Sequence, residues 1–201
     1  MLIYRDIEQG EPEWYQVRAG IPTASMYSAL LAKGEGKTRR TYMLKLAGEV
    51  LTGEPMDNYS NAHMERGHVH EPVARENYAF LMGVEPEQVG FIRNGDTGAS
   101  PDSLVGTDGL LEIKSKLAHL QLDVLLRDEM PSEHTLQVQG QLWVAERAWC
   151  DFVSYCPKLP LFVKRVYRDE PTIQKIAKAV DEFNAELREI VARFQQTSVQ
   201  F

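Results

Sequence analysis

The chain has 201 residues, of which 43% are hydrophobic and 25% are charged, and its net charge at pH 7 is −7. This length and composition are typical of one globular domain with a substantial core, so we expect residues 1–201 to form a single domain. The two cysteines, Cys150 and Cys156, are too few for a four-cysteine zinc or iron–sulfur site. The acidic balance does not indicate non-specific nucleic-acid binding, which a basic balance usually accompanies.

No apolar run approaches the roughly 20 residues that a membrane-spanning helix requires. The first residues, Met1 to Asp6, lack the basic and then apolar pattern of a signal peptide. We therefore expect a cytoplasmic protein without a membrane partner.

In the first segment, Gly20 and Pro22 disfavour regular secondary structure just before Thr23 and Ser25. Either hydroxyl could cap a helix that contains Met26, Leu30 and Leu31. The N-terminus of a helix can bind an anion, and Arg18 could add a charged fork to such a site. On local evidence alone, a capped structural helix with a surface arginine is the simpler interpretation.

A glycine-rich basic loop at 33–37 lacks the Gly-Lys-Ser/Thr ending of a phosphate-binding P-loop, and we interpret it as a connector. Residues 38–51 have apolar positions at helical spacing before Gly53, which predicts a helix. A second helical region is expected over 61–81, where Pro72 either begins a new helix or kinks a continuous one. Its apolar face would contain Ala74, Tyr78 and Leu81.

Three histidines, His63, His68 and His70, lie in this second helical region. Their spacing does not reproduce a His-x-x-x-His pair, which places two zinc ligands on one helix face, and no cysteine is near. We interpret them as solvated or pocket-lining side chains.

Residues 88–93 are expected to form a short strand, and Asn94-Gly95-Asp96 is a strong hairpin signal. The returning strand would occupy 99–105, and after a turn the strand 110–114 would follow. These segments predict an antiparallel meander that carries Asp102, Glu112 and Lys114.

Alternation within the run 110–114 places Glu112 and Lys114 on one face of the strand, with Leu111 and Ile113 on the other. Two acids and a lysine that converge at the end of a strand can hold a divalent metal beside a phosphate. A surface ion-pair cluster would explain the same three residues on local evidence.

The C-terminal half is expected to alternate helices and strands. In chain order we predict helices over 117–127 and 133–144, strands over 150–155 and 161–167, and an amphipathic helix over 170–194. The second of these helices carries Gln137, Gln139 and Gln141 among apolar neighbours.

This order of elements resembles the PD-(D/E)xK nuclease core, which implies an α/β, restriction-endonuclease-like fold with a central mixed sheet flanked by helices. Five spaced motifs narrow the resemblance to the YqaJ-type viral recombinases, the family of bacteriophage lambda exonuclease. In chain order they are Trp14-x3-Arg18-x-Gly20-Ile21-x-Thr23-Ala24-Ser25, Arg66-Gly67-x3-Glu71-Pro72-x-Ala74-Arg75-x2-Tyr78, Ser100-Pro101-Asp102, Glu112-Ile113-Lys114 and Gln137-Val138-Gln139.

The resemblance implies a magnesium-dependent enzyme that degrades one strand of linear double-stranded DNA processively from the 5′ end. It also implies release of 5′-mononucleotides, 3′ single-stranded overhangs and a role in phage-type recombination in a bacterial host. The implied partners are DNA ends, two further copies of the chain in a ring-shaped homotrimer, and a single-strand annealing protein.

The resemblance also implies roles for individual residues. The catalytic positions are Glu71, Asp102, Glu112, Lys114 and Gln137. Two Mg²⁺ ions, which Mn²⁺ can replace, would be bound by Glu71, Asp102, Glu112 and the backbone carbonyl of Ile113. The 5′-phosphate would be bound by Arg18, Ser25 and Ser100.

Two departures from the lambda enzyme concern the surroundings of these residues. His134 stands where that enzyme has a tyrosine three residues before the motif glutamine. The loop before Ser100 is shorter, which leaves Asp96 as a candidate for a further pocket acid.

Two alternatives remain open at this point. One is an endonuclease with the same PD-(D/E)xK core, and the other is a non-catalytic DNA-binding or assembly module with a decayed site. The presence of every motif carboxylate and of the lysine argues against decay.

Overall fold

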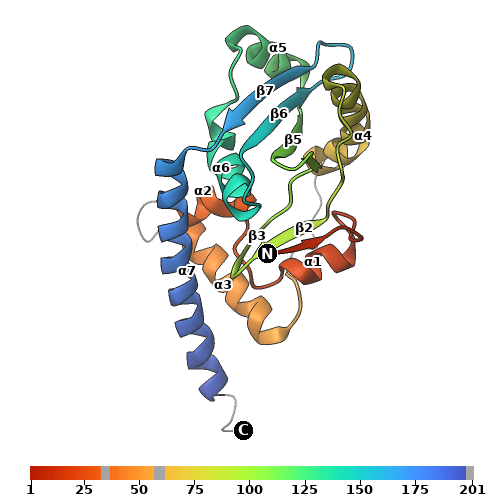
Figure 1. The fold of residues 1–201 in the computed structure, drawn as a ribbon. Coiled ribbons are helices and arrows are strands. Elements are labelled where there is room, and N and C mark those ends of the chain that lie inside the picture. Colours follow the sequence, from red (N-terminus) through yellow and green to blue (C-terminus); the bar gives the residue numbers. More distant parts are fainter. Residues whose placement is uncertain (33–36, 57–61, 198–201) are drawn as a thin grey trace.

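The computed structural model describes residues 1–32, 37–56 and 62–197, and in this part of the chain two small sheets are surrounded by helices (Figure 1). The strands are β1 (Leu2–Tyr4), β2 (Phe91–Asn94), β3 (Thr97–Ala99), β4 (Ser103–Val105), β5 (Gly109–Ser115), β6 (Trp149–Tyr155) and β7 (Phe162–Tyr167). The α-helices are α1 (Pro12–Arg18), α2 (Tyr27–Leu30), α3 (Lys37–Thr52), α4 (Ala62–Met82), α5 (Ala118–Arg127), α6 (Thr135–Val144) and α7 (Glu170–Thr197). Two 3₁₀ turns, η1 (Ala24–Met26) and η2 (Ser132–His134), precede α2 and α6.

The larger sheet has the strand order β4-β5-β6-β7 and is mixed. Its central pair, β5 and β6, is parallel, whereas β4 and β7 are antiparallel to their neighbours. Parallel strands need a long crossover connection, and α5, η2 and α6 provide it here. The mixed α/β fold predicted from the sequence is therefore confirmed.

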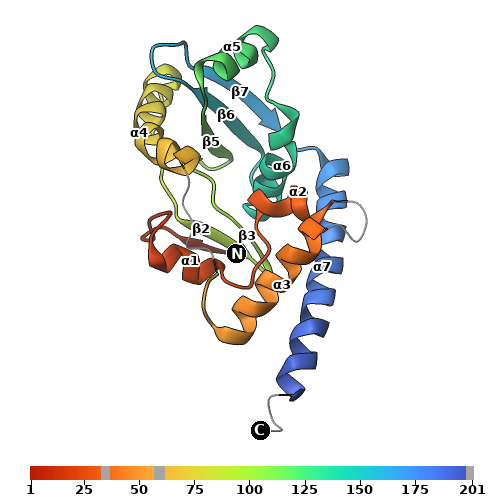
Figure 2. The same ribbon diagram turned by 180° about the vertical axis from the view of Figure 1, so that it is seen from behind.

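Helices cover both faces of this sheet, with α4 on one side and α6 on the other (Figures 1 and 2). Because side chains alternate along β5, Leu111 and Ile113 pack with Ala74 and Tyr78 of α4. Leu110 belongs to the larger core, which includes side chains of α3, α6 and α7. The sheet thus separates two hydrophobic clusters, and Glu112 lies on the side of α6.

The smaller sheet has the order β1-β2-β3, and the β2–β3 hairpin confirms the Asn94-Gly95 turn signal. Gly95 has a φ of +62°, a conformation that glycine adopts without steric cost. The amphipathic helix α7 runs along α3 beside this sheet (Figure 2). No helix in the described part of the chain is long and apolar enough to cross a membrane.

The structure corrects the expected strand over 99–105. That segment is split, because β3 ends at Ala99 in the smaller sheet and β4 begins at Ser103 in the larger one. Pro101 has no backbone N–H to give to a ladder, which is consistent with a break between the strands here. Asp102 therefore lies where the chain passes from one sheet to the other.

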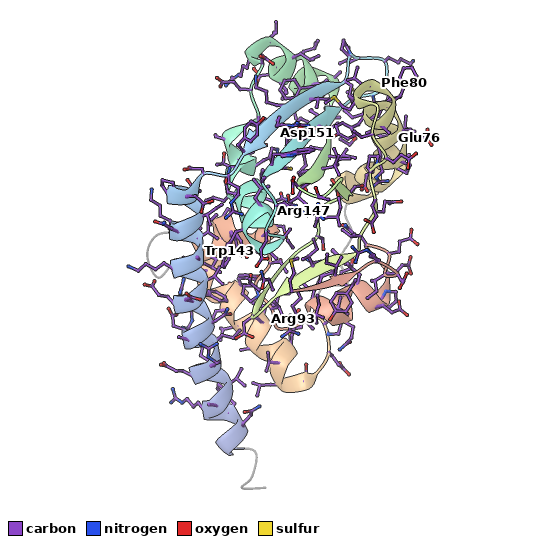
Figure 3. The ribbon with its side chains drawn as sticks, viewed as in Figure 1. Glu76, Phe80, Arg93, Trp143, Arg147 and Asp151 are labelled. Atoms are coloured by element: carbon purple, nitrogen blue, oxygen red, sulfur yellow. The ribbon has the colours of Figure 1, made fainter. Side chains whose placement is uncertain are left out.

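Helix α4 is continuous through Pro72, so Pro72 does not begin a new helix. The prediction that Leu81 faces the core was wrong, since 61% of it is exposed. The chain turns at Gly83, and Val84 packs on the cluster of Ala74 and Tyr78 instead. Phe80, on the same last turn, projects outward from the molecule (Figure 3).

Candidate active site

Glu112 is the most deeply buried acid of the predicted site, with 1% of the residue exposed. Lys114 lies two residues further on the same face of β5, and its Nζ is 2.5 Å from Glu112 Oε1. The alternation predicted for this strand therefore brings the acid and the amine into contact.

Two glutamines of α6 bind the same carboxylate. Gln137 Nε2 donates to Glu112 Oε1 at 2.7 Å, and Gln141 Nε2 donates to Oε2 at 2.6 Å. Residues four apart lie on one face of a helix, so both amides point at β5. Gln139 lies on another side, where it donates to Tyr167 O and accepts from Asp169 N. No role was predicted for Gln141, although it stands four residues after Gln137 in the sequence.

Asp102 is fixed to β5 by two hydrogen bonds. Its Oδ2 accepts from Ile113 N at 2.5 Å, and its own backbone N donates to Leu111 O at 3.0 Å. Burial raises the pKa of Asp102 well above its ordinary value, and repulsion from Glu112 and Glu71 raises it further. The three predicted acids therefore form one electrostatically coupled group.

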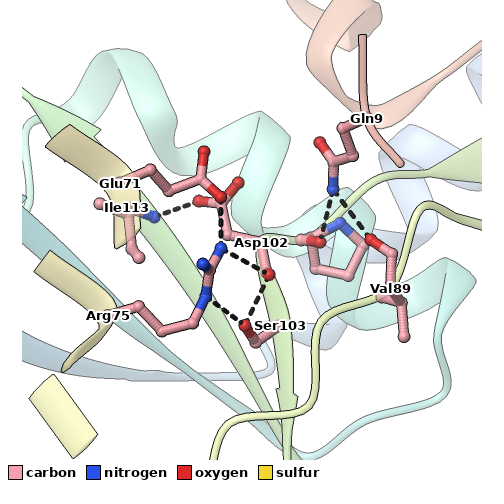
Figure 4. Close-up of polar contacts among 8 residues, drawn as sticks. Gln9, Glu71, Arg75, Val89, Asp102, Ser103 and Ile113 are labelled. Carbon is pink, nitrogen blue, oxygen red and sulfur yellow. Dashed lines mark hydrogen bonds and ion pairs between the residues drawn. The ribbon is translucent and has the colours of Figure 1, made fainter. Parts of the chain in front are cut away.

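Glu71 approaches this group from α4, where it forms an ion pair with Arg75 (Figure 4). Arg75 also donates from Nε to Ser103 Oγ at 3.0 Å and from Nη2 to Asp102 O at 3.3 Å. A cleft of about 400 Å³ opens beside Glu71 and Asp102, and Gln9 and Gln88 line it as well. No role was predicted for Arg75 beyond its place in a motif, since nothing in its local pattern shows that it reaches Asp102.

The environment of Lys114 favours its ammonium form. Burial acts to lower its pKa, but Glu112 and Asp102 outweigh burial, and the pKa is raised above its ordinary value. Lys114 therefore presents a positive charge beside the acids.

His134 stacks on Phe152, with ring centroids 5.2 Å apart, and its Nε2 lies 3.4 Å from Lys116 Nζ. Burial and the positive charges of Lys114 and Lys116 lower the pKa of His134 to about 4. The imidazole is therefore neutral at pH 7, with one ring nitrogen available as an acceptor.

Trp14 joins two of the residues expected at the 5′-phosphate. The Arg18 guanidinium carbon lies 3.6 Å from the centroid of the Trp14 ring, a stacked cation–π arrangement. Trp14 Nε1 donates to Ser100 Oγ at 2.9 Å and to Gly90 O at 3.0 Å. No role was predicted for this indole, because its partners are more than 70 residues away in the sequence.

Ser25, the third residue expected at the 5′-phosphate, is connected to the segment of Ser100 by Thr23. Their hydroxyl oxygens are 3.4 Å apart, and Thr23 pairs with Gly98, two residues before Ser100. Ser25 is exposed within η1, and Thr23 makes no side-chain capping bond there. The predicted helix start is thus a 3₁₀ turn followed by the single turn of α2.

Two other candidate residues, Asp96 and His70, lie in surroundings of their own. Asp96 forms an ion pair with Arg188 of α7 at 3.2 Å, on the surface beside the β2–β3 hairpin. His70 Nδ1 is 2.9 Å from Ser115 Oγ, at the end of β5. The side chains of His63 and His68, like the glycine-rich residues 33–36, lie outside the part that the structure describes.

Among the described side chains, no group of three or more His, Cys, Asp or Glu residues is placed so that it could hold a metal ion, but the acid group offers the right kind of ligand. Carboxylate oxygens are the ligands that Mg²⁺ prefers, and a few of them suffice because the ion keeps several waters. The repulsion that raises the pKa of Asp102 is also what a divalent cation would relieve. The residues present therefore fit such an ion.

The mixed sheet flanked by helices, with Asp102, Glu112 and Lys114 gathered at β5, defines the PD-(D/E)xK class of nuclease folds. Within that class the chain belongs to the family described as the YqaJ-like viral recombinase domain, whose model matches residues 13–148.

Solved structures agree with this assignment. The chain is similar to the alkaline exonuclease LHK-Exo of Laribacter hongkongensis, with 34% identity over 94% of this chain and 99% of that one, and a TM-score of 0.85. The same enzyme in complex with dAMP gives a TM-score of 0.86. A phage-related exonuclease from Haemophilus somnus 129PT, with 13% identity over 90% of this chain and 99% of that one, and a TM-score of 0.66, shares the fold.

A curated relative from Acanthamoeba polyphaga mimivirus, called uncharacterized protein R354, is 26% identical over 73% of this chain. The chain spans only 29% of the length of that relative.

Proposed function

We propose that this chain is a magnesium-dependent exonuclease that hydrolyses one strand of linear double-stranded DNA from the 5′ end and releases 5′-mononucleotides. The observation that carries the proposal is the contact of Lys114 with a buried Glu112 beside Asp102 and Glu71. The 34% identity to an alkaline exonuclease over nearly the whole of both chains supports it.

Asp102, Glu112 and Glu71 would hold two Mg²⁺ ions. When bound, they supply positive charge that offsets the charge developing on the phosphate and leaving oxygens. The Ile113 carbonyl is a further candidate ligand. In a strand the N–H and C=O of one residue face the same neighbour, and Ile113 N faces Asp102, the residue just before the start of β4.

The protein groups have distinct tasks in this proposal. Lys114, held as an ammonium, orients the attacking water and stabilises negative charge in the transition state. Gln137 and Gln141 fix the Glu112 carboxylate in one orientation. Arg18, Ser25 and Ser100 would bind the 5′-phosphate, and Trp14 would hold Arg18 and Ser100 beside each other.

We further propose that the enzyme acts as a ring-shaped homotrimer and supplies 3′ overhangs to a single-strand annealing protein. A ring retains DNA by enclosure, so processive digestion does not require a basic net charge. The acidic balance of the chain is compatible with this arrangement.

The test compares linear and covalently closed circular duplexes of one sequence, each incubated with Mg²⁺ or with EDTA. Digestion of the linear duplex alone, and only with Mg²⁺, is the expected result. Cleavage of the closed circle would indicate an endonuclease, and the absence of any digestion with Mg²⁺ or Mn²⁺ would overturn the proposal.

A further inference from the structure

Arg75 occupies the junction between α4 and the turn that carries Asp102. Only 11% of its side chain is exposed, although it lies at the edge of the cleft. In Figure 4 its guanidinium stands between the Glu71 carboxylate and the backbone of Asp102 and Ser103.

The guanidinium donates to acceptors of Glu71, Asp102 and Ser103, and the side-chain amide of Gln88 also lies beside it. Nη2 binds Glu71 Oε1 and Asp102 O, and Nε binds Ser103 Oγ at 3.0 Å. Ser103 is fully buried and donates in turn to Asp102 O at 2.5 Å. A planar fork of donors can hold these acceptors together, whereas a lysine ammonium would reach fewer of them.

This arrangement links two acids that come from different elements. Asp102 is already fixed to β5 through Ile113 N, but Glu71 stands on α4 with 27% of its side chain exposed. Arg75 donates a hydrogen bond to one carboxylate oxygen of Glu71. This bond restricts the carboxylate to one orientation relative to the Asp102 turn. A ligand held in its binding geometry loses less conformational entropy when a cation binds.

We propose that Arg75 is a positioning residue that holds Glu71 against the Asp102 turn and so sets the affinity of these two acids for a divalent cation. The proposal rests on the metal-dependent function given above. It adds a residue that would bind neither DNA nor metal but would determine how well the metal is held.

Gln9 provides a matched control because it holds the same turn from the other side of the cleft. Its Nε2 donates to Val89 O and to Pro101 O, each at 3.0 Å, without touching a carboxylate. If Arg75 merely stabilised the turn, loss of Gln9 would have the same consequence as loss of Arg75.

The test measures Mn²⁺ binding to the DNA-free protein by electron paramagnetic resonance of the unbound ion. The proteins are the wild type, Arg75→Ala, Arg75→Lys, Gln9→Ala and Asp102→Asn, each checked for folding by circular dichroism and thermal unfolding. Arg75→Ala should weaken binding about tenfold, as loss of a partner of a metal ligand commonly does. Arg75→Lys should weaken it less, and Gln9→Ala should stay within about twofold of the wild type. DNA digestion by Arg75→Ala should recover at high Mn²⁺ concentration.

Wild-type Mn²⁺ affinity in folded Arg75→Ala, or equal losses in Arg75→Ala and Gln9→Ala, would overturn the proposal. If Arg75→Ala does not fold, Arg75→Lys decides, and an affinity equal to that of the wild type overturns it. A wild-type protein that binds no Mn²⁺ through Asp102 would contradict the proposed function itself. A wild type that binds Mn²⁺ and digests DNA, beside an unaffected Arg75→Ala, would remove only the inference about Arg75.

Discussion

The acid site and the Trp14–Arg18–Ser100 group are built in different ways. In the acid site, β5 supplies Glu112 and Lys114 from adjacent same-face positions, and one helix supplies both amides that bind Glu112. In the other group, a single indole joins Arg18 to a serine 86 residues away from that indole. The Glu112 part of the first region depends on regular secondary structure, and the second region depends on the long-range contacts of one side chain. Substitutions in the two regions should therefore affect different steps, hydrolysis in the first and recognition of the DNA end in the second.

The largest effect is expected in the acid site. Asp102→Asn and Lys114→Ala should each lower the digestion rate of linear duplex DNA by about 10³-fold or more, because the first removes a proposed metal ligand and the second removes the ammonium proposed to stabilise the reacting phosphate. The rate is measured with saturating Mg²⁺, and circular dichroism verifies the fold.

Asp108→Asn is the matched control, since this exposed acid lies in the turn between β4 and β5. It should digest DNA at the wild-type rate. Activity near the wild-type level in Asp102→Asn or Lys114→Ala would show that the site is assigned incorrectly.

A smaller effect separates two buried glutamines of the same helix. Gln141→Leu removes a donor to Glu112, so kcat should fall about tenfold as the carboxylate loses its fixed orientation. Gln139→Leu removes bonds to backbone atoms at 167 and 169 and should lower the thermal stability while kcat is retained. Steady-state kinetics and thermal unfolding of both variants check this. Equal changes in kcat would mean that Gln141 acts only through stability.

The Trp14–Arg18–Ser100 group is expected to affect the preference for one kind of DNA end, not the rate of hydrolysis. Arg18→Ala should reduce the preference for 5′-phosphorylated over 5′-hydroxyl ends by about tenfold, the value of one charge-assisted hydrogen bond. Trp14→Phe keeps a ring beneath Arg18 but removes the donor to Ser100, so its preference should fall less. Initial rates on the two kinds of end give the ratio, and an unchanged ratio in Arg18→Ala would remove Arg18 from this role.

Much of the fold could be predicted because its patterns are local. The alternation over 110–114 gave the face shared by Glu112 and Lys114, and the apolar spacing over 38–51 gave α3. The split between β3 and β4 was not predicted. Near Pro101 the alternation of side chains is the same whether one strand continues or the chain passes to another sheet.

The parts of the site that escaped sequence analysis are contacts between distant segments. Arg75 reaches the Asp102 turn only because α4 packs on β5, and Trp14 reaches Ser100 only because α1 lies against β2. Neither contact follows from residue type or spacing. The roles of Arg18, Ser25 and Ser100 came from the resemblance to a family, and they remain predictions.

The central claim, hydrolysis from the 5′ end by this acid site, is tested most directly by the position of a label. A linear duplex carries a label at the 5′ terminus or at the 3′ terminus of the same strand, and early products are separated by size in the presence of Mg²⁺. The 5′ label should appear first as a mononucleotide while the 3′ label stays in long strands, and Asp102→Asn should release neither. Earlier release of the 3′ label, or release of the 5′ label by Asp102→Asn, would contradict the account.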